Sequence, residues 1–196
     1  GTPGTGKTSF AAAFADAACR RGERCLFFSF EESPDQIIRN VQSIGIDLTP
    51  HLESGLLRIH SSRPTLFGLE MHLVLMLKEI REVRPQAVIV DPLSDLIAVG
   101  STKDVKMMLV RLVDYLKMQQ ITAFFTHLIH TREALQPSDL AVSSIIDTLI
   151  HLRDIECGGE HNRGMFILKS RGMAHSNQIR EYRITDGGIV IEREYR

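Results

Sequence analysis

The chain opens with the stretch Gly1-Thr2-Pro3-Gly4-Thr5-Gly6-Lys7-Thr8, which matches the pattern G-x-x-x-x-G-K-[ST] at every fixed position. The glycines of this pattern let the backbone curl, so that successive N–H groups point inward at phosphate oxygens. The lysine then reaches the β- and γ-phosphates, and the hydroxyl that follows it binds Mg²⁺. The alternative is a chance glycine turn before a helix. We predict a nucleoside triphosphate site. The residues assigned to it in this stretch are Gly4, Thr5, Gly6, Lys7, Thr8 and Ser9.

The residues after the loop have the pattern of the helix that such a loop requires. Apolar side chains recur at helical spacing from Phe10 to Ala18, and Arg20-Arg21-Gly22 supplies a basic last turn and a glycine stop. The positive end of this helix adds to the anion site. A phosphate-binding loop normally follows a buried parallel strand. We therefore expect an apolar strand just before Gly1, which would make the 196 residues part of a longer polypeptide.

Length and composition are those of a single domain, residues 1–196, with a substantial core. The chain is 43% hydrophobic and 24% charged, which is ordinary for a globular protein. Its formal net charge of −1 provides no general attraction to nucleic acid or to anionic membranes. We expect no membrane span and no signal peptide. Because Cys19, Cys25 and Cys157 have neither metal-ligand nor disulfide spacing, we expect a reducing, cytoplasmic location.

Apolar runs and amphipathic stretches alternate through the first two-thirds of the chain. The apolar runs predict strands over residues 25–30, 56–59, 87–91 and 121–126. The amphipathic stretches predict helices over residues 33–44, 69–83 and 105–116. Beyond them we expect antiparallel strands, added to the sheet edge, near residues 146–155, 164–169, 180–185 and 189–192. This order predicts an α/β fold with a mostly parallel central sheet and helices on both faces.

Three carboxylates follow apolar strands, at the edge where open parallel sheets bind their ligands. Asp91 ends the run over residues 87–91, a place where NTPases hold Mg²⁺ directly or through water. Of Glu31 and Glu32, one can orient and deprotonate an attacking water, while the other tunes it or contacts Mg²⁺. Acidic pairs before a helix are also ordinary caps that complement its dipole. We assign Glu31 and Glu32 to catalysis, and we assign the metal to Thr8, Glu31 and Asp91.

Polar residues at two later strand ends have two interpretations each. His127 follows the strand over residues 121–126, and it either senses the γ-phosphate or is a satisfied polar residue. Lys169 and Arg171 are two apart in extended chain, so their side chains point to one side, and Gly172 allows an abrupt change of direction. These cations are either solvated or inserted into a neighbouring subunit's nucleotide, where Arg stabilises transition-state charge.

Four motifs occur in order along the chain. They are residues 1–8, Phe30-Glu31-Glu32-Ser33, Val90-Asp91-Pro92-Leu93-Ser94 and Lys169-Ser170-Arg171-Gly172-Met173-Ala174-His175. Together they resemble the RecA-like ATPases of the KaiC circadian-clock family, over Gly1 to about Ile191. The resemblance implies a RecA-like P-loop NTPase fold. Residues 143–148 and 179–186 look more like the family's C-terminal, autokinase-bearing repeat than its N-terminal one.

The resemblance implies a homohexameric ring with ATP and Mg²⁺ at the subunit interfaces and with regulatory protein partners. Glu31 and Glu32 would be its catalytic pair. The residues that it brings to a neighbour's ATP are Lys169, Ser170, Arg171, Gly172 and His175, with Lys169 and Arg171 acting in catalysis. It also implies serine autokinase activity on Ser143 and Ser144, whose alternative role is a cap or a strand entry. The protein would act as a signalling or circadian-type switch.

Two other functions compete with this one. A RecA-like DNA motor or recombinase needs a basic groove with aromatic side chains on which bases stack. The loop that would face the channel, residues 131–144, contains Arg132 as its only cation, together with Glu133 and Asp139, and it has no aromatic residue. We therefore expect no nucleic-acid partner. A scaffold that binds the nucleotide without turnover would bind ATP but release no phosphate.

Overall fold

The structure, a computed structural model, describes residues 1–129, 144–157 and 160–194. A parallel four-stranded sheet in the order β2-β1-β3-β4 forms the centre of the first two-thirds of the chain. Its strands are β1 (Cys25–Ser29), β2 (Leu57–Ser61), β3 (Ala87–Asp91) and β4 (Thr122–Phe125). Each strand overlaps the range that its apolar run predicted, so the parallel sheet is confirmed.

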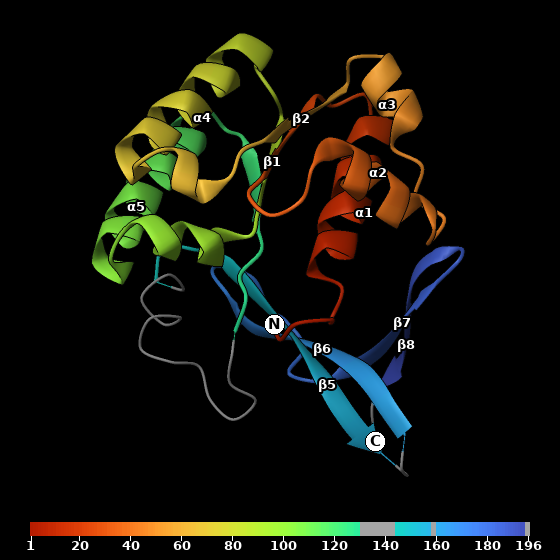
Figure 1. The fold of residues 1–196 in the computed structure, drawn as a ribbon. Coiled ribbons are helices and arrows are strands. Elements are labelled where there is room, and N and C mark those ends of the chain that lie inside the picture. The colour runs from red at the N-terminus through yellow and green to blue at the C-terminus, as the bar shows by residue number, and fades with distance from the viewer. Residues whose placement is uncertain (130–143, 158–159, 195–196) are drawn as a thin grey trace.

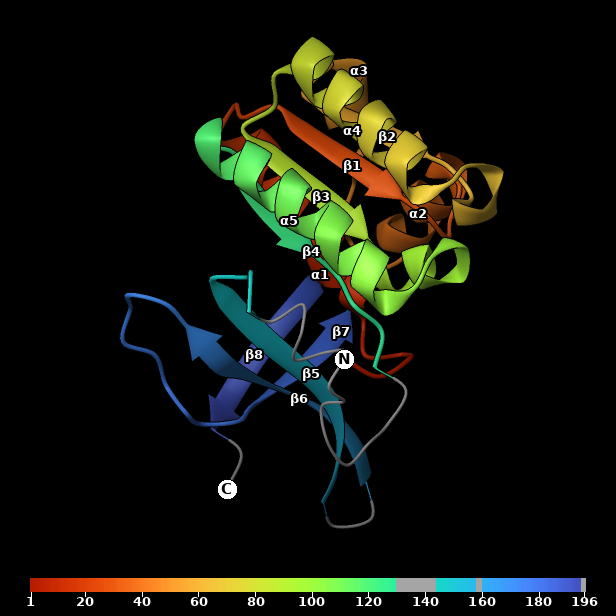
Figure 2. The same cartoon turned by 90° about the vertical axis from the view of Figure 1, so that its left-hand side faces the viewer.

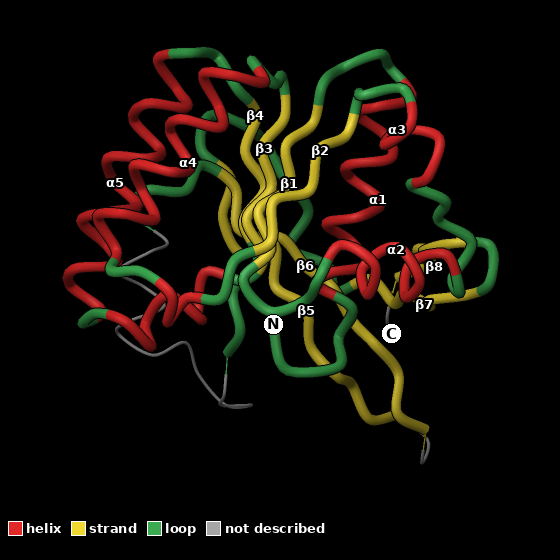
Figure 3. The backbone as a smooth tube through the Cα atoms, turned by 45° about the horizontal axis from the view of Figure 1, so that its top comes forward, coloured by secondary structure: helices red, strands yellow, loops and turns green. Residues whose placement is uncertain are grey.

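Helices cover both faces of this sheet (Figure 1). One face is covered by α1 (Lys7–Arg20), α2 (Pro34–Gln42) and the short α3 (Thr49–Glu53). The other face is covered by α4 (Leu69–Val83) and α5 (Thr102–Met118). Figure 3 shows the strands running between the two helical layers. Two 3-10 helices, which the sequence did not predict, are η1 (Pro64–Leu66) and η2 (Leu93–Val99). None of the described helices combines the length and apolarity that crossing a bilayer would require.

The central strands β1 and β3 are buried along their whole length because both of their faces are covered. Alternate side chains of each strand point to opposite faces. Leu26 and Phe28 of β1 pack in the core under α4 and α5, whereas Phe27 packs in the core under α1 and α2. The continuous apolar runs in the sequence are explained by these two cores, since a strand with one wet face would alternate.

The last four strands form a separate antiparallel sheet in the order β5-β6-β7-β8. They are β5 (Thr148–Cys157), β6 (Glu160–Ser170), β7 (Arg180–Thr185) and β8 (Gly188–Glu194). The antiparallel pairing predicted for this part of the chain is confirmed, but these strands form a sheet of their own and do not extend the edge of the parallel sheet. Figure 2 shows this sheet beside the phosphate-binding end of the molecule, where the N-terminus lies next to β5.

Candidate nucleotide-binding site

The phosphate-binding stretch forms a glycine-dependent loop that leads directly into α1. Gly4 and Gly6 have φ angles of 77° and 80°, in the left-handed region that glycine adopts without strain. Gly6 is also the N-cap of α1, so the loop ends at the positive end of a 14-residue helix. The Thr5 side chain is buried, and its hydroxyl donates to the Thr2 carbonyl at 2.8 Å. The loop therefore has a fixed shape in front of an anion-binding helix terminus.

Thr8 and Asp91 lie far apart in the sequence and meet beside this loop. The Thr8 hydroxyl donates to Asp91 Oδ2 at 2.7 Å, and the Thr126 hydroxyl donates to the other carboxylate oxygen. Asp91 ends β3 and Thr126 follows β4, and these two strands are parallel neighbours. Their carboxyl ends therefore lie at the same edge of the sheet. Two of the three residues that the sequence assigned to a metal, Thr8 and Asp91, are in direct contact there.

Lys7, the first residue of α1, lies between the loop and several carboxylates. Its ammonium donates to the Thr2 carbonyl at 2.8 Å. Burial lowers the pKa of Lys7, and the carboxylates of Asp91, Glu31 and Asp154 act in the opposite direction. A partly buried cation is a favourable partner for a polyanionic ligand, because salt screens its charge less than that of a surface lysine.

Glu31 follows β1 and belongs to the group of charges around Lys7. Burial is the largest effect that raises the pKa of Glu31. The neighbouring carboxylates of Asp95 and Asp91, and then Glu32, raise this pKa further, while Lys7 acts in the opposite direction. A carboxylate with a raised pKa is a stronger base than an ordinary one, which suits a residue that accepts a proton.

Glu32 differs from Glu31 in its surroundings, although the two are adjacent in the sequence. Its carboxylate accepts from the side-chain amide of Asn40 on α2 at 3.2 Å. Its backbone carbonyl accepts from the hydroxyls of Ser29 and Ser61, at 2.7 and 2.8 Å. The structure therefore separates the predicted pair: Glu31 interacts with the charges of the phosphate site, and Glu32 is bonded to α2 and to the ends of two strands.

Asp95 is a member of this charge group that the sequence analysis missed. It lies on η2, which follows Asp91 and lies at the carboxyl edge of the sheet. Burial is the main cause that raises the pKa of Asp95, and Asp91 contributes, while a hydrogen bond from Ser94 lowers it. The sequence offered one signal for Asp95, its place four residues after Asp91 at the end of β3. Nothing in the sequence showed that η2 would keep Asp95 close to the phosphate site.

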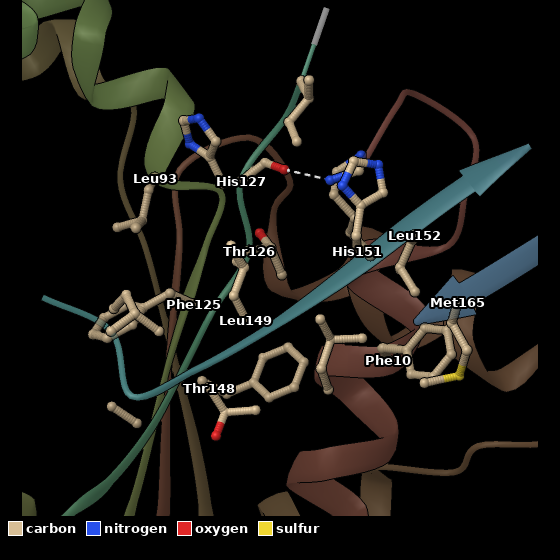
Figure 4. Close-up of a pocket in the computed structure, with 17 residues that line it drawn as sticks. Phe10, Leu93, Phe125, Thr126, His127, Thr148, Leu149, His151, Leu152 and Met165 are labelled. Atoms are coloured by element: carbon tan, nitrogen blue, oxygen red, sulfur yellow. Dashed lines mark hydrogen bonds between the residues drawn. The ribbon is translucent and has the colours of Figure 1, made fainter. Parts of the chain in front are cut away.

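His127 follows β4, as predicted, and lies at a cavity of about 310 Å³ between β4 and β5 (Figure 4). The cavity is mainly apolar: Phe125 lines the β4 side, and Leu149 and Leu152 line the β5 side. The His127 carbonyl accepts from Gly1 N at 3.0 Å, the dashed line in Figure 4. Both interpretations of the His127 ring, phosphate sensor and satisfied polar residue, stay predictions.

The residues predicted to act on a neighbour's nucleotide lie at the end of β6. Their side chains form hydrogen bonds with residues 144–148, which lead into β5. Lys169 Nζ donates to the Ile146 carbonyl at 2.8 Å, and Arg171 Nη2 donates to the Ser144 carbonyl at 2.6 Å. The Ser170 and Thr148 hydroxyls are 3.0 Å apart. Figure 2 shows that β6 runs past the N-terminus and ends on the side away from the phosphate loop.

The remaining predicted residues follow β6 or precede β5. Gly172 has a φ of 69°, the left-handed conformation that permits the predicted change of direction. The His175 side chain is exposed, and its Nδ1 lies 3.5 Å from the Met173 carbonyl. Ser144 is exposed. Residues 131–143, which include Ser143 and nearly all of the loop predicted to face the channel, lie outside the described residues.

The loop, the helix behind it and the strand-end aspartate define a P-loop NTPase of RecA-like α/β fold. A family model described as "ATPase: KaiC" matches residues 1–196, and the chain therefore belongs to the KaiC ATPase family. It is similar to circadian clock protein KaiC2 of Synechocystis sp., with 47% identity over the whole chain and 35% of that protein. It also resembles KaiC3 of Synechocystis at 37% identity and the clock oscillator protein KaiC of Picosynechococcus at 36%, covering 39% and 38% of them.

The chain spans little more than a third of the length of these relatives. The expectation that the chain is most like the family's C-terminal, autokinase-bearing repeat stays a prediction.

Proposed function

We propose that this chain is an ATP-binding and ATP-hydrolysing domain that holds Mg²⁺ at Thr8 and Asp91. The hydrogen bond between Thr8 and Asp91 supports this most directly, because it places a hydroxyl and a carboxylate together beside the phosphate loop. Mg²⁺ is commonly bound through one or two carboxylates, with phosphates and waters completing its shell. In the described part of the chain no group of three His, Cys, Asp or Glu side chains is placed to hold a metal alone. That fits a site completed by the nucleotide, where the ion neutralises phosphate charge.

The chain's own residues divide the remaining tasks. The backbone N–H groups of the loop and the Lys7 ammonium bind the phosphate oxygens and orient the γ-phosphate. Glu31 orients the attacking water and accepts its proton, since burial and nearby carboxylates raise the pKa of Glu31. Glu32, hydrogen-bonded to Asn40 in the last turn of α2, ties the segment before the helix to it and so holds the backbone that carries Glu31.

Hydrolysis is tested by phosphate release from ATP with the full natural polypeptide, once with Mg²⁺ and once with excess EDTA. We expect release that requires Mg²⁺ and stops with EDTA, because the triphosphate charge is then left uncompensated. ATP binding without phosphate release in either condition would contradict the proposal and favour the scaffold function instead.

We also propose that the strand leading into the phosphate loop lies in the cavity between β4 and β5. Gly1 N donates to the His127 carbonyl and Ile129 N donates to the Gly1 carbonyl, both at 3.0 Å, which is the bonding pattern of parallel neighbours. β4 and β5 are the end strands of their sheets, and both line the apolar cavity. A strand there would join the two sheets. In an ATP titration, residues 1–196 alone should bind ATP more weakly than a chain that also includes the residues before Gly1. Equal affinity of the two would contradict the proposal that a strand lies in the cavity.

The proposal includes a homohexamer in which Lys169, Arg171 and His175 reach a neighbour's ATP. It also includes a cytoplasmic switching role with regulatory protein partners. What supports the ring is that the β6 end carrying these residues points away from the chain's own phosphate loop (Figure 2). Cys19 and Cys25, buried free thiols, fit a reducing compartment.

Serine autokinase activity is a second candidate, and it depends on one contact. Arg171 Nη2 donates to the Ser144 carbonyl at 2.6 Å, so the exposed Ser144 lies beside the cation proposed to reach a neighbour's γ-phosphate. A phosphate on Ser144 would add about −1.5 to −2 charge next to Arg171, which would change the contacts at a subunit interface.

Transfer between subunits is tested by mixing tagged Lys7→Ala chains with intact chains and labelled ATP. We expect label on Ser144 of the tagged chains, because they cannot bind ATP themselves and depend on a neighbour. Tagged chains that also carry Ser144→Ala are the control. A preparation that hydrolyses ATP but labels neither Ser143 nor Ser144 would show an ATPase without kinase activity.

A further inference from the structure

The outer side of the phosphate loop is bonded to the antiparallel sheet of its own chain. In a phosphate-binding loop the N–H groups face the ligand, so the carbonyl groups face away from it. The Thr5 carbonyl accepts from the Tyr182 hydroxyl of β7 at 2.5 Å. The neighbouring Gly4 carbonyl accepts from Arg163 Nε of β6 at 3.3 Å. Two successive loop carbonyls are thus held by two adjacent strands.

Tyr182 is itself held rigidly. Its side chain is 1% exposed, and its ring packs edge-on against Phe10 of α1, with centroids 5.1 Å apart. On β7 it pairs with Arg163 of β6 on one side and with Ile191 of β8 on the other. Burial raises the pKa of Tyr182, so the hydroxyl keeps its proton and stays a donor.

The same face of β7 contacts the loop a second time. Ile184 lies two residues after Tyr182 and therefore points to the same side of the strand. A Cβ on Gly6 would lie 2.5 Å from Ile184 Cδ1 and would displace the end of that side chain, so the glycine lets the sheet approach the loop this closely. The loop leads into α1 and is packed between this helix and the antiparallel sheet.

We propose that Tyr182 is a positioning residue that fixes the phosphate loop in its nucleotide-binding shape, with Arg163 as a weaker second anchor. A loop held by its carbonyl side keeps its N–H donors aimed at the triphosphate before binding. The loop then loses less conformational freedom when the nucleotide binds. The inference depends on the proposed function, because it assumes that this loop binds a triphosphate.

The test is Tyr182→Phe, which keeps the ring and its packing on Phe10 and removes only the hydroxyl. We expect the KM for ATP and its dissociation constant to rise about three- to tenfold, the range for one hydrogen bond, with kcat changed less than about twofold. Tyr115→Phe on α5, remote from the loop, is the matched control and should leave both values unchanged. Arg163→Gln should raise the dissociation constant by a smaller factor.

A purely structural role would give a different result. It would lower the unfolding temperature without reducing the extra stabilisation that ATP provides, whereas the positioning role predicts that this ATP-induced increase becomes smaller. If Tyr182→Phe binds ATP as tightly as the parent protein, the inference is wrong and the proposed function stands. If the parent protein itself binds no ATP, the proposed function fails first. If Tyr182→Phe does not fold, Arg163→Gln decides, and an unchanged dissociation constant there contradicts the inference.

Discussion

Replacing Lys7 by alanine is expected to abolish ATP binding at physiological nucleotide concentrations. Lys7 is the cation that the loop sequence assigns to the β- and γ-phosphates, and it lies among the carboxylates of Asp91, Glu31 and Asp154. Without its ammonium, those carboxylates would repel the triphosphate. Loss of one partner of a desolvated charge pair weakens binding by roughly 10²-fold or more. Calorimetric titration of ATP into the parent protein and into Lys7→Ala measures the difference.

A suitable control for Lys7→Ala removes the same charge elsewhere. Lys103 is exposed on α5, outside the loop, so Lys103→Ala should bind ATP as the parent protein does. The fold of Lys7→Ala is checked by its circular dichroism, because the lysine also donates to the Thr2 carbonyl. Parent-like affinity in a folded Lys7→Ala protein would mean that the triphosphate does not bind at this loop.

The fold and the centre of the site were predictable because their signals are local. The loop pattern fixes the backbone over residues 1–8, and the apolar runs of β1 and β3 identify strands buried on both faces. The contact between Thr8 and Asp91 follows from one further rule, that the carboxyl ends of parallel strands share an edge. None of these steps needs information about which distant segments touch.

The rest of the site depends on such distant contacts. The bond from Tyr182 to the Thr5 carbonyl joins residues 177 positions apart, and no pattern in either segment specifies it. Glu31 and Glu32 look alike in the sequence, and only the position of α2 shows that Glu32 is bonded to Asn40. Asp95 was missed because a 3-10 helix after β3, with no strong periodicity, turns the chain back toward the site.

The family could be predicted because its motifs are spread over the whole chain. They agreed with the KaiC ATPase family, and the full-length match confirms it. The resemblance to the autokinase-bearing repeat depends on two short stretches, residues 143–148 and 179–186, and stays a prediction.

The two carboxylates after β1 should differ in their effects on turnover. Glu31→Gln keeps the size and hydrogen bonding of the side chain but removes the base, so we expect kcat for ATP hydrolysis to fall by about 10²-fold or more. ATP affinity should stay the same or improve, because one negative charge near the triphosphate is lost. Glu32→Gln should lower kcat far less, since Glu32 is bonded to Asn40 and can keep accepting through its amide oxygen. Single-turnover phosphate release and ATP titration of both variants provide the two measurements.

The pH dependence of hydrolysis adds a test specific to Glu31. A general base must be deprotonated, and the pKa of Glu31 is raised by burial and by neighbouring carboxylates. The kcat/KM of the parent protein, which reports the groups of the free enzyme, should therefore decline as the pH falls through a Glu31 pKa raised above its ordinary value, with full activity on the alkaline side. Glu31→Gln should lack that decline, because its remaining activity no longer depends on this proton. Unchanged turnover in Glu31→Gln, or the same acid limb in both proteins, would contradict the base assignment. Glu31 would then be a charge that complements the start of α2.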